Sequence, residues 1–248
     1  MRGFFRVVLA GTLLLAAGIV LAPAAWLDRP LAARTHERLR LVEAHGFWWR
    51  GHGVLTTADG HARLPIAWHV ALAPLLSGVL AVDLGGDGDD GSPSGSLRAR
   101  GGTLEARDLR LRVPAALVPA LAPALQPFAL GGELRVHAPS IVFRGDRGTG
   151  TLDATWQRAR VTTAYVALDL GTVSMSAAPA GDALAGTIRN TGGDVAIAGT
   201  IGGRAGTFDA ALTLAPTPGA PEMVRQALPL LGPPDGAGGV RIAWRSGR

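Results

Sequence analysis

The residues best suited to chemistry lie in one acidic, glycine-rich stretch from Gly85 to Gly95. Its glycines fit the G-x-G-x-x-G spacing that cradles a dinucleotide, at Gly86, Gly88 and Gly91. That motif requires a helix directly after the glycines, and Ser92-Pro93-Ser94-Gly95 does not begin one. Carboxylates that could bind Ca²⁺ stand at Asp87, Asp89 and Asp90, but the downstream glutamate of an EF-hand loop is missing. We interpret the stretch as a solvated acidic loop.

The histidines and the missing residue types argue against catalysis. The six histidines, at positions 36, 45, 52, 61, 69 and 137, include no H-E-x-x-H pair, and their spacing places no two predictably on one face. The chain has no Cys and no Lys, which excludes disulfides, thiolate metal sites, a cysteine nucleophile and a Schiff base. It also has no G-x-S-x-G elbow, and its acidic residues occur mostly singly beside arginines. The sequence therefore predicts a protein that is not an enzyme and has no metal site and no cofactor.

The positive charge of the chain comes from arginine alone. All 24 basic residues are Arg, against 19 Asp and Glu, which gives a formal net charge of +5. Because the arginines are spread singly and lack an aromatic-flanked motif, we expect no nucleic-acid partner.

An uncharged apolar segment near the N-terminus has the length of a membrane span. Val7 to Ala25 carries no charge and as a helix would extend about 28 Å, and Trp26 follows where an interfacial aromatic belongs. A cleaved signal peptide is the alternative, because Arg2 and Arg6 precede the segment and Ala22-Pro23-Ala24 resembles a cleavage site. We favour a retained anchor, since the segment is long for a signal. The residues assigned to the anchor are Val7, Leu14, Leu15, Ala25 and Trp26.

Residues 1–26 are then a cytoplasmic stub and a transmembrane helix, and residues 27–248 form a domain in the periplasm. In that domain the apolar residues recur at a spacing of two, the period of a β-strand, in roughly ten to twelve segments. The 35 Gly and 17 Pro are too many for a helical bundle. The predicted fold class is mainly β: after the N-terminal transmembrane helix comes a curved, mostly antiparallel β-sheet with bulges and one or two short helices. Residues 85–95 are a candidate subdivision within this folding unit.

Two Gly-Gly pairs predict β-hairpins with defined registers. The turn at Gly101-Gly102 sets up the pairs Leu97 with Ala106, Arg98 with Glu105 and Ala99 with Leu104. The turn at Gly202-Gly203 sets up the pairs Val195 with Ala210 and Ile197 with Phe208. The alternation changes phase at Arg107-Asp108 and again at Pro139-Ser140, which predicts a bulge at each place and a strongly curved sheet.

Three segments favour short helices. The first runs from Leu27 to Leu39, with Asp28 in position to cap it. The second runs from Pro114 to Pro127, where the prolines permit one or two turns. The third, Glu222 to Leu231, places on one face Met223, Ala227 and Leu230.

Tryptophans gather soon after the anchor. Trp48 and Trp49 stand in the segment Gly46-Phe47-Trp48-Trp49-Arg50-Gly51, and Trp68 follows. Tryptophan in a small β domain usually fills the core, which is the first interpretation. The second is a contact with a partner or with the membrane surface.

Short motifs follow one another in a fixed order along nearly the whole chain. They are Leu21-Ala22-Pro23-Ala24-Ala25-Trp26-Leu27, Arg38-Leu39-Arg40-Leu41, Ala44-His45-Gly46-Phe47-Trp48-Trp49-Arg50-Gly51, Leu64-Pro65-Ile66-Ala67-Trp68, Leu75-Leu76-Ser77-Gly78, Leu130-Gly131-Gly132-Glu133-Leu134, Gly150-Thr151-Leu152 with Trp156, and Leu230-Leu231-Gly232-Pro233-Pro234-Asp235. This arrangement resembles the type II secretion system protein N family of Gram-negative bacteria. The chain departs from the family's pattern at Phe47-Trp48 and in the acidic insertion from Gly85 to Gly95.

The resemblance implies an accessory inner-membrane component, with one membrane pass, of the apparatus that exports folded proteins from the periplasm. Its role would be structural, in assembly, and not enzymatic. Its implied partners are other inner-membrane subunits of the secretion platform, reached within the membrane or through the β domain, with strand addition at a sheet edge as one route.

A lipid-handling protein is the alternative from another class, because a bent sheet with one apolar face resembles the groove of periplasmic lipid carriers. The two functions differ in whether side chains fill the apolar face or leave it open for acyl chains. Bulk on the inward positions favours a filled face and comes from Phe143, Trp156, Phe208 and Trp244.

The anchor makes a testable prediction. Replacing Leu14 or Leu15 by Arg should weaken membrane insertion, since an arginine at mid-span costs about 2.5–3.5 kcal/mol on insertion scales. The measurement is the partition of the protein between membrane and soluble fractions. Unchanged partition would show that the segment is not a retained anchor.

Overall fold

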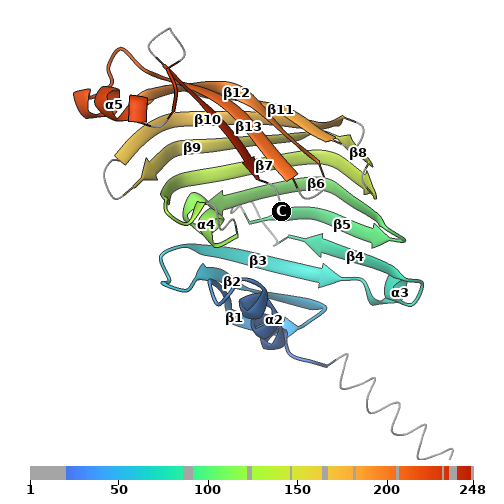
Figure 1. Ribbon diagram of the computed structural model, residues 1–248. Helices are drawn as coiled ribbons and strands as arrows, with labels where there is room; N and C mark the ends of the chain where they lie inside the picture. Colours follow the sequence, from blue (N-terminus) through green and yellow to red (C-terminus); the bar gives the residue numbers. More distant parts are fainter. Residues whose placement is uncertain are drawn as a thin grey trace, which may run out of the picture.

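The computed structural model describes residues 21–85, 92–121, 125–145, 147–163, 167–180, 183–204, 207–230, 232–234 and 239–246. Within these residues, alternating polar and apolar positions form fourteen strands that join in a single sheet (Figure 1). The strands are β1 (Leu39–Phe47), β2 (Arg50–Thr57), β3 (Arg63–Val70), β4 (Val79–Leu84), β5 (Ser94–Arg100), β6 (Thr103–Pro114), β7 (Ala129–Arg144), β8 (Arg147–Gly150), β9 (Leu152–Thr162), β10 (Ala167–Ala180), β11 (Ala183–Thr191), β12 (Val195–Arg204), β13 (Thr207–Pro216) and β14 (Val240–Ser246). The short helices are η1 (Ala24–Leu27), α2 (Asp28–Arg34), α3 (Leu72–Leu75), η2 (Ala115–Leu117), α4 (Val118–Leu121), α5 (Glu222–Ala227) and η4 (Leu228–Leu230), where η marks a 3₁₀ helix.

The order of strands in the sheet follows the sequence from β1 to β14, and every pair is antiparallel. The short strand β8 departs from this order, since it pairs with β7 beside the start of β9. The predicted mainly β, antiparallel class is confirmed, and the structure has a few short helices where one or two were predicted. Short turns between chain neighbours give this antiparallel order. Figure 1 shows that the sheet is open and curved.

The acidic loop lies between two strands that pair with each other. β4 and β5 pair from Val79 opposite Arg100 to Leu84 opposite Gly95, so the sheet is continuous across this point. The glycines and carboxylates singled out at positions 86–91 lie outside the described residues.

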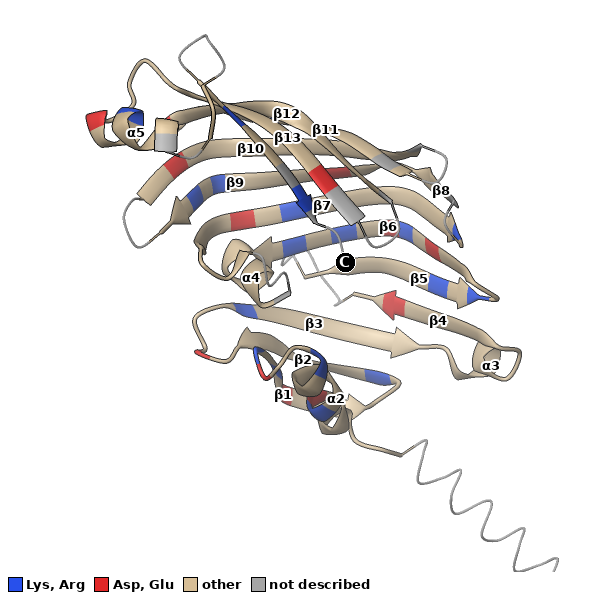
Figure 2. Ribbon diagram, in the orientation of Figure 1, with Lys and Arg blue, Asp and Glu red and all other residues tan. Residues whose placement is uncertain are grey.

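The sheet has one apolar and one polar face, and the strand registers keep these faces aligned. A row of apolar residues crosses β3 to β7 through Val70, Val82, Leu97, Ala106 and Ile141, each opposite the next. On the other face, a polar row crosses β6 to β10 through Arg110, His137, Asp153 and Ser176. The charged residues in Figure 2 are accordingly spread over many strands.

Two hydrophobic clusters cover the two ends of the apolar face. At one end, Val224 and Leu228 pack with buried residues of β9, β10, β12 and β14 such as Val195 and Val240. At the other end, Leu117 of η2 and Leu31 of α2 pack with Leu39 and Leu64.

The C-terminal helix buries a different face from the predicted one. Val224 and Leu228, four residues apart, are buried, while Met223 is exposed. The sequence correctly placed short helices at Leu27 to Leu39, at Pro114 to Pro127 and at Glu222 to Leu231, each somewhat shorter than predicted.

The first predicted hairpin is confirmed and the second is wrong in register. Across Gly101-Gly102, Ala99 lies opposite Leu104, Leu97 opposite Ala106 and Arg98 opposite Glu105. In β12 and β13, by contrast, Gly202 and Gly203 lie within the strand, opposite Asp209 and Phe208. Ile197 therefore lies opposite Leu214 and Val195 opposite Pro216. The longer ladder forms three more backbone pairs beyond Ile201 while keeping the same residues on the apolar face.

Both predicted changes of phase are present, and they lie opposite each other. Asp108 of β6 has a positive φ of 48°, and the register with β5 shifts beside it. In β7, His137 and Ile141 are four residues apart, whereas their partners Asp153 and Gly150 are only three apart. The strand β7 therefore has one extra residue between these two positions. Because β6 and β7 slip together, the register between them is continuous and their apolar residues stay on one face.

A further bulge, at Arg158 of β9, was not predicted. Gly131 lies opposite Arg160 and Glu133 opposite Gln157, so β9 has one extra residue between these pairs. Arg158 has a φ of 49° and Gly132 one of 94°. A Cβ on Gly132 would collide with the carbonyl oxygens of Gln157 and Arg158, so the bulge requires glycine there.

Gly132→Ala should therefore destabilise the fold far more than an alanine at an open glycine. Gly102 is the matched control, because its φ is 78° but nothing lies within 4 Å of an added Cβ. We expect a loss of about 2–4 kcal/mol in the free energy of unfolding for Gly132→Ala and about 1 kcal/mol for Gly102→Ala. Denaturant unfolding of the full chain in detergent measures both. Equal losses would show that the bulge does not constrain the backbone at Gly132.

Candidate functional site

The tryptophans singled out in the sequence meet at the tip of the β1–β2 hairpin. Trp48 and Trp49 form its turn, with Phe47 opposite Arg50 closing the ladder. The ring of Trp49 is stacked on that of Phe47, with centroids 5.9 Å apart and an interplanar angle of 4°. The ring of Trp49 also lies near that of His69, with centroids 6.3 Å apart and an interplanar angle of 60°. The tip is therefore an ordered aromatic surface.

Trp68, on β3, is joined to this tip by a hydrogen bond. Its Nε1 donates to the backbone oxygen of Trp48 over 2.9 Å. Gly51 lies opposite Trp68, and a Cβ there would lie 2.9 Å from the indole carbon Cζ2. Trp48, Trp49 and Trp68 are all half-buried, so the structure brings the three residues together at the rim of the fold.

The segment that leads in from the N-terminus is fixed to the same hairpin. The backbone N–H of Trp48 donates to the oxygen of Ala22 over 3.1 Å, and Pro23 forms a β-bridge with Phe47. Ala22 and Ala24 are buried, whereas Trp26 is 67% exposed. Among the described residues, packing against the sheet therefore begins at Ala22.

This packing places the end of the predicted anchor in the fold. Ala25 and Trp26 lie in η1, a single 3₁₀ turn after an extended Pro23. The other anchor residues, Val7, Leu14 and Leu15, lie outside the described residues. None of the helices from Leu21 onward that the structure describes is long and apolar enough to cross a membrane.

Asp28 fastens the helix that follows to β1. Its carboxylate accepts bonds from Arg40, Nη2 to Oδ2 at 2.6 Å and Nε to Oδ1 at 3.0 Å, and from the backbone N–H of Leu41 at 2.8 Å. The hydrogen bond from Arg40 holds the pKa of Asp28 below the usual value for aspartate. The predicted capping role is wrong: the N-cap of α2 is Leu27, and Asp28 instead joins α2 to β1.

The histidine prediction also needs correction in one place. His45 and His52 lie opposite each other in β1 and β2, with ring centroids 5.4 Å apart, so two histidines do share a face. A hairpin turn read at Trp48-Trp49 would have revealed this pair. Among the residues that the structure describes, no three His, Cys, Asp or Glu side chains are grouped to hold a metal ion.

The Asp28 contact makes stability depend on pH. Because the pKa of Asp28 is lower in the folded than in the unfolded chain, its contribution is complete at neutral pH and is lost as pH falls through the lowered value. Asp28→Ala should reduce the free energy of unfolding by about 1–2 kcal/mol at pH 7, and the difference should shrink below about pH 4. Unfolding curves across this range measure it.

Glu37→Ala is the matched control for the Asp28 prediction. Glu37 also pairs with Arg40, at 3.6 Å, but its side chain is exposed. Its removal should change stability by less than about 0.5 kcal/mol. A difference between wild type and Asp28→Ala that stays constant down to pH 2 would contradict the account.

A family model matches the chain over nearly the whole sheet. The family model described as "Type II secretion system (T2SS), protein N" matches residues 37–243, from just after α2 into β14. No curated protein and no solved structure matches the chain. The match confirms the resemblance seen in the sequence motifs and covers most of the chain. The chain belongs to the type II secretion system protein N family and is thus a component of that secretion system.

Proposed function

We propose that the protein is an accessory component of the type II secretion system, held in the inner membrane by one helix that begins near Val7 and ends near Leu21, before the residues that pack in the fold. The bulk of the chain lies in the periplasm, where the sheet has a structural, assembly role. The family is one of secretion components and not of enzymes, which supports a non-catalytic role.

The observation that carries this proposal is that the chain is fixed to the sheet directly after the apolar segment. Ala22 is buried and hydrogen-bonded to the hairpin through Trp48, and Asp28 fixes the next turn to β1 through Arg40. A span ending near Leu21 would therefore hold the sheet against the membrane surface in one orientation. Such a fixed orientation suits a part that positions other subunits.

The aromatic tip then lies at the membrane surface. Trp26 is exposed there, and Phe47, Trp48 and Trp49 are close to the entering segment. Aromatic side chains favour the interface between lipid and water. The contact role considered for Trp48, Trp49 and Trp68 becomes a proposal that this tip touches the bilayer or a neighbouring membrane subunit.

The far end of the sheet offers the second contact to a subunit of the platform. In the part of the chain that the structure describes, β14 is the last strand of the sheet and pairs with β13 from Val240 to Ser246. Its other edge is bridged by Pro234 at Val240, and the N–H of Arg241 donates to the oxygen of Pro233 over 2.9 Å, so the exposed edge is the part beyond Arg241. An end strand of this kind can accept a strand of a partner.

Lipid handling remains the second candidate function because one rim of the apolar face is open. Leu80, Leu104 and Phe143 lie in one row across β4 to β7 and are 44%, 47% and 39% exposed. Leu75, Leu80 and Leu104 line a depression of about 540 Å³. Acyl chains fit such a surface. The ends of the face are filled by helices, so we place the assembly role first.

The proposed role predicts a secretion defect that depends on the anchor. In a strain that lacks the chain, a substrate of the type II system should accumulate in the periplasm, because assembly of the platform is impaired. The full chain should restore its export, Leu14→Arg should not, and Leu14→Ile should. The ratio of substrate in medium to periplasm measures this. Normal export in the strain without the chain would contradict the proposal.

A further inference from the structure

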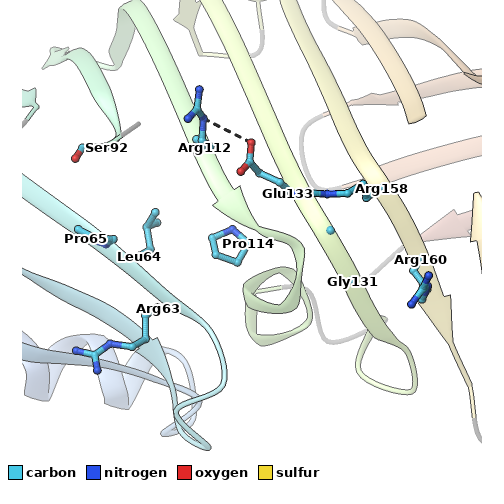
Figure 3. Close-up of a pocket in the computed structure, with 11 residues that line it drawn as sticks. Arg63, Leu64, Pro65, Ser92, Arg112, Pro114, Gly131, Glu133, Arg158 and Arg160 are labelled. Carbon is cyan, nitrogen blue, oxygen red and sulfur yellow. Dashed lines mark ion pairs between the residues drawn. The ribbon is translucent and has the colours of Figure 1, made fainter. Parts of the chain in front are cut away.

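One hollow on the molecule is a pocket of about 620 Å³ lined with arginines (Figure 3). It opens where β3 and β6 come close at one end of the sheet. β4 pairs with β3 only from Trp68 to Val70, and β5 pairs with β6 only as far as Arg110. The first half of β3 and the last residues of β6 therefore face each other, with none of the described strands between them. Residues of β3, β6, β7 and β9 form the walls.

The pocket carries a strong positive charge. Its lining includes Arg63, Arg112, Arg158 and Arg160, and Glu133 is its one carboxylate among the described residues. In Figure 3, Arg112 and Arg158 lie on either side of Glu133. Glu133 already accepts a bond from Arg135 at 2.6 Å and lies 3.5 Å from Arg112.

Two of these arginines have no acidic partner among the residues that the structure describes. Within the described part of the chain, neither Arg158 nor Arg160 forms an ion pair, whereas Arg63 pairs with Glu43 on its outer side. Figure 2 shows basic positions, in blue, on both β6 and β9. Unneutralised guanidinium groups gathered at a hollow attract anionic ligands.

The bulge of β9 places both arginines at this pocket. Trp156 and Ala159 occupy successive apolar positions, and Arg158 is the extra residue between them, with a φ of 49°. Positive φ is unfavourable for arginine, and strained residues cluster where binding requires them. The glycines opposite, Gly131 and Gly132, leave the floor of the pocket without side chains.

We propose that this pocket binds an acidic peptide segment, rich in Asp and Glu, of a partner protein. Guanidinium groups bind carboxylates in bidentate fashion. Arg112 lies opposite Arg135, and Arg158 lies beside Gly132. Their backbones are therefore two strands apart across the sheet and about three residues apart along it, or about 14 Å in all. An extended peptide repeats its side chains on one face about every 7 Å, so two such repeats span this distance. A row of linked carboxylates therefore fits the separated arginines better than a single headgroup. The inference rests on the proposed function only for the class of partner, a subunit of the secretion apparatus.

A labelled hexaglutamate peptide tests this proposal with the full chain in detergent micelles. Fluorescence anisotropy should show saturable binding that weakens as salt is raised. The double variant Arg158→Gln with Arg160→Gln should weaken binding about tenfold or more. Arg63→Gln, on the opposite wall, should weaken it less, because Arg63 already pairs with Glu43. The matched control is Arg98→Gln with Arg189→Gln, which removes the same charge from exposed positions elsewhere and should leave binding within about twofold.

Three results would overturn the proposal. The first is that the wild type does not bind the peptide at low salt. The second is that the pocket and control variants lose peptide binding equally. The third is that binding to vesicles of anionic phospholipid depends on Arg158 and Arg160 while binding to the peptide does not. Thermal unfolding of each variant shows that its fold is kept. Export of substrate in cells is a separate measurement, so failure of peptide binding with export intact affects the pocket alone.

Discussion

Every strand of this sheet must keep its apolar residues on the same side as those of its neighbours. Burial of apolar surface contributes about 25 cal/mol per Å², so a strand one residue out of phase would lose its share of the core. The bulges satisfy this constraint in a coordinated way. Asp108 of β6 and the slip at Pro139-Ser140 of β7 lie opposite each other, which lets both strands change phase without losing register.

The same constraint creates the two surfaces on which the functional account depends. At β9 the bulge keeps Trp156 and Ala159 on the apolar face and moves Arg158 to the polar side, where it lines the arginine pocket. At β1 the sheet offers a rigid hairpin, and Ala22, Pro23 and Asp28 fix the entering segment to it. The pocket and the entering segment are thus both set by backbone geometry.

Alternation in the sequence predicted the class of fold, the hairpin at Gly101-Gly102 and two bulges, because each of these changes which residues share a face. It could not fix the hairpin near Gly202, since moving a partner by six residues leaves every side chain on the same face. The bulge at Arg158 was readable from the spacing of Trp156 and Ala159 but was missed. The bond from Arg40 to Asp28 was not readable, because it depends on how α2 packs against β1.

In the proposed function, this member of the type II secretion system protein N family works by contacting other subunits of the platform. Gentle detergent extraction from the native membrane, followed by mass spectrometry of the proteins and lipids that come with the chain, tests it most directly. The account predicts recovery of platform subunits without a stoichiometric lipid. Stoichiometric phospholipid in the absence of those subunits would contradict it and would favour the open apolar rim at Leu80, Leu104 and Phe143 as the working surface.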